Sequence, residues 1–237
     1  METERPSALV FDVFGTVVDW RSSLIGELTE FGRRSGLDVD WAGLVDAWRA
    51  AYKPSMDRVR RGEQTWTPLD DLHRASLDRL LEERGLAGLA ESDKRWINLG
   101  WHRLKPWPDS VPGITRLKQR YIVGPLSNGN VALLVDMARH SALPWDVVFG
   151  ADLFRRYKPD PETYLGVARL LRLAPAQVML VAAHNEDLAA ARALGLKTGF
   201  VPRATEYGPL QKKDFAADQP WDVVARDMEH LAELMGA

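Results

Sequence analysis

A short apolar run over residues 8–11 opens the hydrophobic pattern of the chain and ends directly on Asp12. Such a run, bounded by a glycine-containing turn, predicts a buried strand of a parallel sheet. Asp12 then lies at the carboxyl end of that strand, where ligands bind in open α/β folds. Asp12 is therefore a candidate nucleophile or metal ligand, and the alternative is an acid that only caps the following turn.

Residues of about 20 to 105 contain no convincing strand. Their apolar positions recur at helical spacing and predict amphipathic helices over 22–35, 41–61, 69–84 and 91–99. Asp40, and the Thr67-Pro68 pair, are typical of residues at which helices begin. We expect this block to be a helical unit inserted after the first strand.

From Pro112 onward, short apolar runs alternate with amphipathic segments. They predict strands over 121–126, 147–150, 178–182 and 198–201, with helices over 131–140, 161–171 and 187–194. Strands connected by helices of this length form parallel sheets. The predicted fold class is α/β, with a Rossmann-like parallel-sheet core of residues 1–19 and 108–237. A helical cap domain of residues 20–107 is inserted after the first strand.

Composition excludes several classes of function. The 237 residues include 31 Lys and Arg against 33 Asp and Glu, and this net charge of −2 gives no indication of nucleic-acid binding. The absence of cysteine excludes disulfides, thiolate chemistry and cysteine-based zinc sites. Residues 1–5 lack the apolar core of a signal peptide, and no apolar run approaches the ~20 residues of a membrane helix. We expect a cytoplasmic protein with no nucleic-acid or membrane partner.

Polar residues follow four of the predicted strands. Asp12 ends the first, Ser127-Asn128 ends the second, Lys158 follows the third, and a segment from His184 to Asp187 follows the fourth. Because the carboxyl ends of parallel strands share one edge of the sheet, these groups are expected to converge on one pocket.

The order of these motifs resembles the haloacid dehalogenase superfamily, in which phosphatases predominate. Phosphatases of that superfamily carry a second acid two residues after the nucleophile, where this chain has Phe14, and a Mg²⁺-binding acid where it has Ala183. Both differences disfavour phosphoryl transfer, because Mg²⁺ needs carboxylate ligands and the leaving alcohol needs a proton. A Mg²⁺-dependent phosphatase, with Glu186 as a substitute ligand, and an inactive binding relative are the alternatives.

The remaining pattern resembles the L-2-haloacid dehalogenase (type II) branch, which uses no metal. Its features include the aromatic Phe14, the Trp48-Arg49 pair in the second cap helix, and Tyr164 six residues after Lys158. Ser127-Asn128-Gly129 matches the second motif of that branch. The fourth motif differs, since His184 replaces an Asn and Glu186 stands where an aromatic residue helps to hold the halide.

This resemblance implies hydrolysis of short 2-haloalkanoic acids to 2-hydroxy acids and halide through an aspartyl ester. The substrates expected are haloacetates, with fluoroacetate as a candidate, and L-2-halopropionates. The partners are this small-molecule haloacid and the halide ion; no cofactor or metal is expected, and a homodimer is expected by family analogy. The implied site residues are catalytic Asp12, Thr16, Lys158, His184 and Asp187, halide-binding Arg49 and Asn128, and substrate-binding Val13, Phe14, Ser127 and Tyr164.

Overall fold

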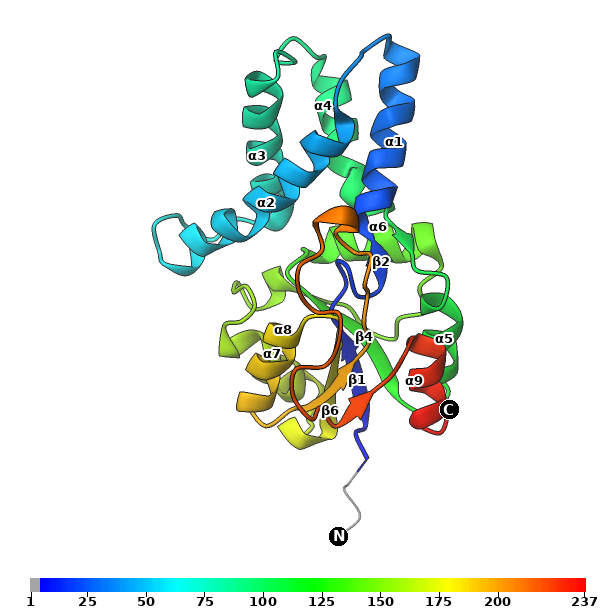
Figure 1. Ribbon diagram of the computed structural model, residues 1–237. Helices are drawn as coiled ribbons and strands as arrows, with labels where there is room; N and C mark the ends of the chain where they lie inside the picture. Colours follow the sequence, from blue (N-terminus) through cyan, green and yellow to red (C-terminus); the bar gives the residue numbers. More distant parts are fainter. Residues whose placement is uncertain (1–4) are drawn as a thin grey trace.

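A six-stranded parallel sheet forms the centre of the molecule (Figure 1). The computed structural model describes residues 5–237. The strand order is β5-β4-β1-β6-β7-β8, and every neighbouring pair is parallel. The strands are β1 (Ala8–Phe11), β4 (Ile122–Ser127), β5 (Phe149–Gly150), β6 (Val178–Ala182), β7 (Lys197–Phe200) and β8 (Val223–Val224). The predicted fold class is confirmed, with β1 between β4 and β6.

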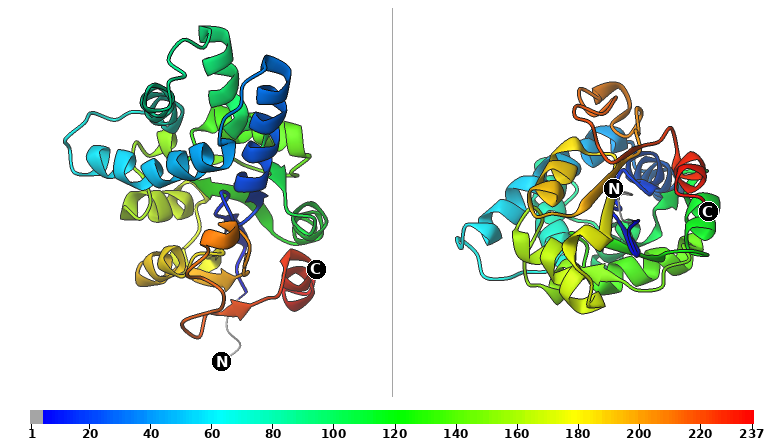
Figure 2. Two further views of the ribbon diagram at one scale, coloured as in Figure 1. Left: turned by 45° about the horizontal axis from the view of Figure 1, so that its top comes forward. Right: turned by 90° about the horizontal axis from the view of Figure 1, so that it is seen from below.

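Helices cover both faces of this sheet. Viewed in Figures 1 and 2, α7 and α8 lie on one side and α5 and α9 on the other. Alternation along β1 explains this layering, because Val10 packs in one apolar cluster while Leu9 and Phe11 pack in the other. The helices of the core are α5 (Ser110–Leu117), α6 (Val131–Ser141), α7 (Pro161–Leu171), α8 (Asn185–Ala193) and α9 (Met228–Leu234).

Four helices form a layer beyond the carboxyl edge of the sheet, at the top of Figure 1. They are α1 (Trp20–Ser35), α2 (Trp41–Arg60), α3 (Leu69–Glu83) and α4 (Glu91–Asn98). Asp19 and Asp40 cap α1 and α2 through their side chains, accepting hydrogen bonds from the backbone N–H groups of Ser22 and Gly43. Within residues 5–237, no helix combines the length and apolar character needed to cross a membrane.

A short antiparallel pair joins the two segments that connect this helical layer to the sheet. It consists of β2 (Val18–Asp19) and β3 (Lys105–Pro106). The expectation of no strand up to residue 105 is therefore wrong at Lys105, because a two-residue strand leaves no periodic signal. The division into 1–19 plus 108–237 and 20–107 stays a prediction, and residues 1–4 lie outside the described residues.

Several other elements differ from the sequence-based expectations. The strand expected over 147–150 is reduced to Phe149–Gly150, because β4 pairs with it only through Leu126 and Ser127. Helix α8 begins two residues earlier than expected, at Asn185. Helices α5 and α9 and strand β8 were not predicted. The chain also contains short 3₁₀ helices at η1 (Leu99–Arg103), η2 (Ala151–Leu153), η3 (Pro175–Gln177) and η4 (Gly208–Leu210).

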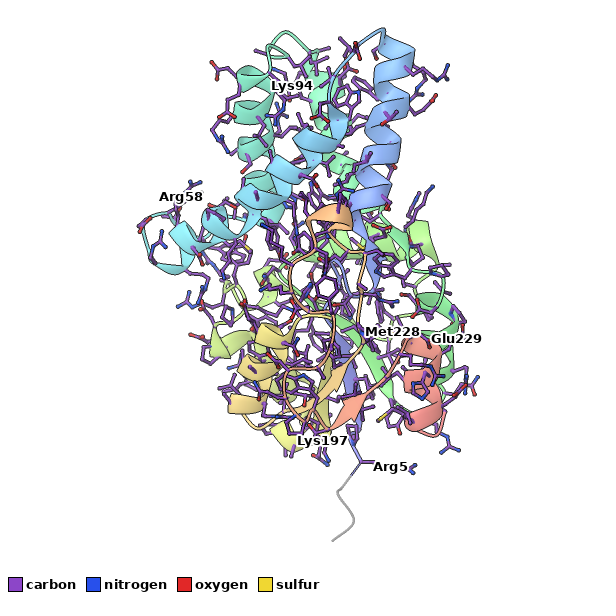
Figure 3. The ribbon with its side chains drawn as sticks, in the orientation of Figure 1. Arg5, Arg58, Lys94, Lys197, Met228 and Glu229 are labelled. Carbon is purple, nitrogen blue, oxygen red and sulfur yellow. The ribbon has the colours of Figure 1, made fainter. Side chains whose placement is uncertain are left out.

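Side chains fill the space between the helical layer and the sheet (Figure 3). The buried apolar cluster includes the aromatic residues Phe14, Trp20, Trp48 and Trp101. Trp101 is central to them, with Trp48 edge-on at 5.4 Å and Phe14 edge-on at 5.7 Å between ring centroids. His73 stacks on Trp101 at 4.3 Å and is 1% exposed, and in the described part of the chain neither of its ring nitrogens has a hydrogen-bond partner. Burial lowers the pKa of His73 to about 3, so the folded protein holds this ring neutral.

Replacing His73 with Phe is expected to make the protein less sensitive to acid. The unfolded chain protonates His73 near its ordinary pKa while the folded protein does not, so wild-type stability falls as the pH drops below about 6.5. At about pH 5 this costs roughly 2 kcal/mol. Urea unfolding at about pH 8 and about pH 5 measures the difference. His140→Gln, on an exposed histidine, is the control, and an equal pH dependence in the His73→Phe variant and wild type would contradict the prediction.

Candidate active site

Asp12 receives three side-chain hydrogen bonds at the carboxyl end of β1. Lys158 Nζ lies 2.9 Å from its Oδ1, while Thr16 Oγ1 at 2.7 Å and His184 Nδ1 at 3.0 Å approach its Oδ2. Burial alone would raise the pKa of Asp12, but the Lys158 ammonium and His184 hold it well below its usual value. The carboxylate is therefore ionised and fixed in orientation.

The tight turn after β1 explains how these donors reach Asp12. Gly15 has a φ of +89°, and a Cβ there would lie 2.1 Å from Glu206 Oε1. The left-handed backbone favours glycine, and a Cβ at this position would displace the Glu206 carboxylate. The turn brings Thr16 back toward Asp12, and Thr16 Oγ1 also accepts a 2.9 Å hydrogen bond from the Ala183 N–H. Thr16 thus ties the loop after β1 to the loop after β6.

Lys158 bridges two carboxylates from different strands. Its ammonium donates to both Asp12 and Asp187, and these two charges raise its pKa although burial opposes them. Its backbone N–H donates to Asn128 Oδ1 at 2.7 Å, which fixes the loop that carries it. Tyr164 OH donates to the other oxygen of Asp187 at 2.6 Å. One ion-paired cluster therefore unites residues that follow β1, β4, β5 and β6.

Glu206 belongs to this site, although no pattern in the sequence predicted it. It is 1% exposed, its Oε2 lies 2.8 Å from His184 Nε2, and its Oε1 accepts from Trp20 Nε1 at 3.0 Å. The segment carrying Glu206 follows β7 and has neither a motif nor apolar periodicity. Arg203 anchors that segment by donating to the Thr16 carbonyl at 2.9 Å and pairing with both oxygens of Asp109.

Arg49 brings a positive charge from the helical layer to the same pocket. Its guanidinium carbon lies 4.3 Å from the Tyr52 ring centroid and 5.2 Å from that of Trp20. Its Nη2 lies 3.8 Å from Glu206 Oε1, while its buried Nη1 has no hydrogen-bond partner among residues 5–237. A cation with an unused donor is suited to binding an anion.

A cavity of about 520 Å³ lies above these groups. Of the expected site residues, Asp12, Phe14, Arg49, Asn128, Lys158, Tyr164, His184 and Asp187 line it. Thr16 does not line the cavity but donates a hydrogen bond to Asp12 Oδ2. Val13 is buried beside the cavity, and Ser127 Oγ accepts a 3.1 Å hydrogen bond from Gly129 N–H without lining it.

Glu186 does not turn inward to oppose an anion. Its carboxylate pairs with Lys213 at 2.9 Å, and its side chain is 72% exposed at the rim of the cavity. Within residues 5–237, no group of three or more His, Cys, Asp or Glu side chains is placed to hold a metal ion.

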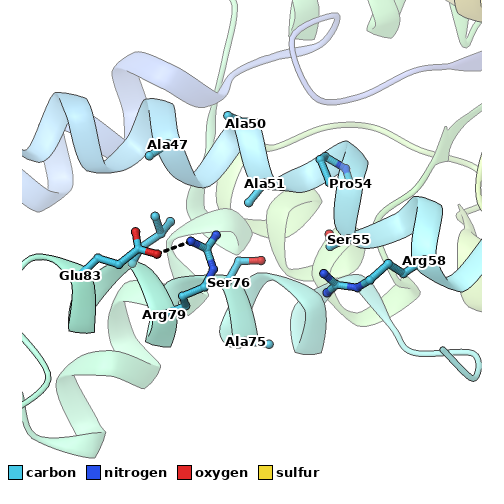
Figure 4. A pocket seen from close by; sticks show the side chains of 11 residues that line it. Ala47, Ala50, Ala51, Pro54, Ser55, Arg58, Ala75, Ser76, Arg79 and Glu83 are labelled. Carbon is cyan, nitrogen blue, oxygen red and sulfur yellow. Dashed lines mark hydrogen bonds and ion pairs between the residues drawn. The ribbon is translucent and has the colours of Figure 1, made fainter. Parts of the chain in front are cut away.

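A second hollow, of about 570 Å³, lies between α2 and α3 (Figure 4). Small side chains such as Ala47, Ala51 and Ala75 line it, and Arg79 pairs with Glu83 at its edge. It lacks the combination of nucleophile and converging charges that distinguishes the cavity above Asp12.

Comparison with known proteins identifies the family to which the chain belongs. A family model described as haloacid dehalogenase-like hydrolase matches residues 6–195. The crystal structure of an L-2-haloacid dehalogenase is 53% identical with a TM-score of 0.95, covering 98% of this chain and 99% of that one. A defluorinating L-2-haloacid dehalogenase is 47% identical, also with a TM-score of 0.95, covering 98% and 96%. The (S)-2-haloacid dehalogenase 4A of Burkholderia cepacia is 26% identical, covering 95% and 97%.

Removing the Lys158 ammonium is expected to destabilise the fold in a pH-dependent way. In Lys158→Met, the buried carboxylates of Asp12 and Asp187 face each other without the cation, which costs about 3 kcal/mol near neutral pH. Protonation of one carboxylate relieves the repulsion, so the difference from wild type narrows as the pH falls. Denaturant unfolding across the acid range measures this, with the exposed Lys105→Met as control. A stability gap that does not change with pH would contradict the predicted repulsion.

Proposed function

Because the chain belongs to the haloacid dehalogenase-like hydrolases, and within them to the L-2-haloacid dehalogenases, we propose that it hydrolyses short 2-haloalkanoic acids to 2-hydroxy acids and halide. Haloacetates and L-2-halopropionates are the proposed substrates, with fluoroacetate as a candidate. The observation that carries the proposal is the ionised Asp12, held by Lys158 and Thr16 at the floor of the cavity. A carboxylate in this state is a nucleophile that needs no general base.

In the first step, an Asp12 oxygen forms a bond to C2 of the substrate while the carbon–halogen bond breaks. The bonding pair leaves with the halide, and the product is an aspartyl ester. Because the halide departs as an anion, no acid is needed to protonate it, which agrees with Phe14 in the position of the phosphatase acid. Arg49 and Asn128 are the proposed halide ligands, since Arg49 has an unused donor and stays charged.

The substrate carboxylate needs donors on the other side of Asp12. We assign this role to Lys158 and to the backbone N–H groups of Val13 and Phe14. The Ser127 hydroxyl accepts from Gly129 N–H, which leaves its own hydrogen free to donate. Tyr164 holds Asp187 beside the same position.

In the second step, water attacks the ester carbonyl carbon. Asp187 or His184 was expected to take the proton of that water. Both His184 nitrogens already face carboxylates, whereas Asp187 retains lone pairs, so Asp187 is the proposed proton acceptor. Collapse of the tetrahedral intermediate releases the 2-hydroxy acid and restores Asp12.

A substrate panel with and without EDTA separates this activity from its alternatives. Halide release from L-2-chloropropionate or fluoroacetate is expected to be unaffected by EDTA. Phosphate release from p-nitrophenyl phosphate that EDTA abolishes would instead identify a Mg²⁺-dependent phosphatase. No turnover of any member of the panel would favour an inactive binding relative.

Loss of the nucleophile is expected to abolish halide release in Asp12→Asn. The amide is not an anion, so neither the ester nor the halide can form. In wild type, a single turnover in ¹⁸O-water is expected to place the label in Asp12, which mass spectrometry of the peptide detects. Product formation with no label in Asp12 would remove this residue as the nucleophile.

The assembly and location of the protein are also proposals. A homodimer is proposed by family analogy, and light scattering of the full chain is expected to give twice the 26.6 kDa chain mass. A measured mass equal to that of a single chain would contradict the homodimer. A cytoplasmic location and the division between core and cap at residues 19/20 and 107/108, both expected from the sequence pattern, are likewise proposals.

A further inference from the structure

We propose that Glu206 is a positioning residue that keeps His184 positively charged, so that His184 donates a hydrogen bond to Asp12 Oδ2 throughout ester hydrolysis. This role rests on the proposed dehalogenase activity. It makes His184 an electrostatic donor to the ester and not the base that activates water.

The hydrogen-bond geometry requires this charge state. His184 Nδ1 lies 3.0 Å from Asp12 Oδ2, and Nε2 lies 2.8 Å from Glu206 Oε2. A neutral imidazole carries one N–H, so it could donate to only one of these carboxylates and would set a lone pair against the other. The ring therefore carries both protons. Burial lowers the pKa of His184, but Glu206 and Asp12 raise it well above its usual value.

The charges that surround the ring are balanced only when Glu206 is ionised. The anions near His184 are Asp12, Asp187 and Glu206, and the cations are Lys158, Arg49 and the ring itself. Burial raises the pKa of Glu206, yet His184, Arg49 and the Trp20 donor lower it below its usual value. If Glu206 lost its charge, three cations would face two anions, and His184 is the cation that gives up its proton most easily.

The two oxygens of Asp12 are not equivalent in this arrangement. Oδ2 accepts hydrogen bonds from Thr16 and His184, whereas Oδ1 accepts only from Lys158 among the residues that the structure describes. The less engaged Oδ1 is therefore the atom that forms the bond to substrate C2. Oδ2 then becomes the carbonyl oxygen of the ester, with two donors already directed at it.

These donors stabilise the charge that develops during hydrolysis. Water oxygen bonds to Cγ of Asp12, the carbonyl π pair moves onto Oδ2, and the water proton passes to Asp187. Thr16 and the His184 cation stabilise the resulting oxyanion. The pair then returns, the Cγ–Oδ1 bond breaks, and the leaving alkoxide takes the proton from Asp187. Oδ1 departs in the 2-hydroxy acid, and the water oxygen remains in Asp12. The second proton of that water is released to solvent, which restores the Asp12 carboxylate.

The donor role and a base role predict that Glu206→Gln moves different limbs of the pH profile. Neutralising Glu206 lowers the pKa of His184 in either case. If His184 acts as a charged donor, the alkaline limb of ester hydrolysis moves to lower pH by about one unit or more. If His184 acts as a base, the acid limb moves to lower pH instead. Single-turnover decay of the preformed ester measures this step directly, and movement of the acid limb would overturn the proposal.

The charge of His184 can be tested without any turnover. Imidazole NMR titration of the substrate-free full chain is expected to show His184 losing its proton at lower pH in Glu206→Gln than in wild type. Glu27→Gln removes another ion-paired carboxylate, bound to Arg103 in the cap, and is expected to leave the His184 titration and the pH profile unchanged. An unchanged titration in folded Glu206→Gln would contradict the proposal even if the enzyme dehalogenates. A wild-type protein that forms no ester would instead reject the dehalogenase activity.

A second variant keeps the proposal testable if Glu206→Gln folds poorly. His184→Asn places an N–H donor near Oδ2 that does not titrate. Its ester hydrolysis is expected to be slower than wild type and to lack the alkaline limb that His184 causes, because no proton is lost from Asn. An alkaline limb at the wild-type position in this variant would assign that limb to another group and overturn the donor role.

Discussion

The contact of the Lys158 ammonium with Asp12 and Asp187 is the interaction on which the site depends. It places one buried cation between two buried carboxylates that follow different strands. The Lys158 cation acts with His184 to keep Asp12 charged, and the two carboxylates in turn stabilise the buried cation. The same contact therefore holds the sheet edge together and keeps the nucleophile ionised.

The charge pattern continues from the sheet into the helical layer above it. Glu206 contacts His184 on one side and receives the Trp20 indole N–H on the other, with Arg49 nearby. The two layers thus share buried charges in addition to apolar contacts. Because a buried charge that loses its partner is costly, their relative placement is fixed more closely than aromatic packing alone would fix it.

Sequence reasoning was strongest where local pattern and chemistry coincide. The apolar run before Asp12 indicated both a strand and a reactive carboxylate, and the alternation after Pro112 indicated a parallel sheet with polar strand ends. The direction of a side chain cannot be predicted from local pattern, as Glu186 shows. Its ion-pair partner Lys213 lies in a segment distant in the chain and holds the carboxylate at the exposed rim. Glu206 was missed for a related reason, since only the folded chain brings it to Gly15 and His184.

The hydrogen bond from Trp20 to Glu206 has a consequence for modular engineering. Trp20 is the first residue of α1, so the first side chain of the helical layer bonds to the buried acid that faces His184. Chimaeras that exchange whole caps between relatives would replace this donor and Arg49 together. The grafted cap would then have to supply a matching N–H group and cation. Otherwise the Glu206 carboxylate would remain buried without these two partners. Compatibility between cap and scaffold therefore depends on the contacts of Trp20 and Arg49 with Glu206 as well as on shape.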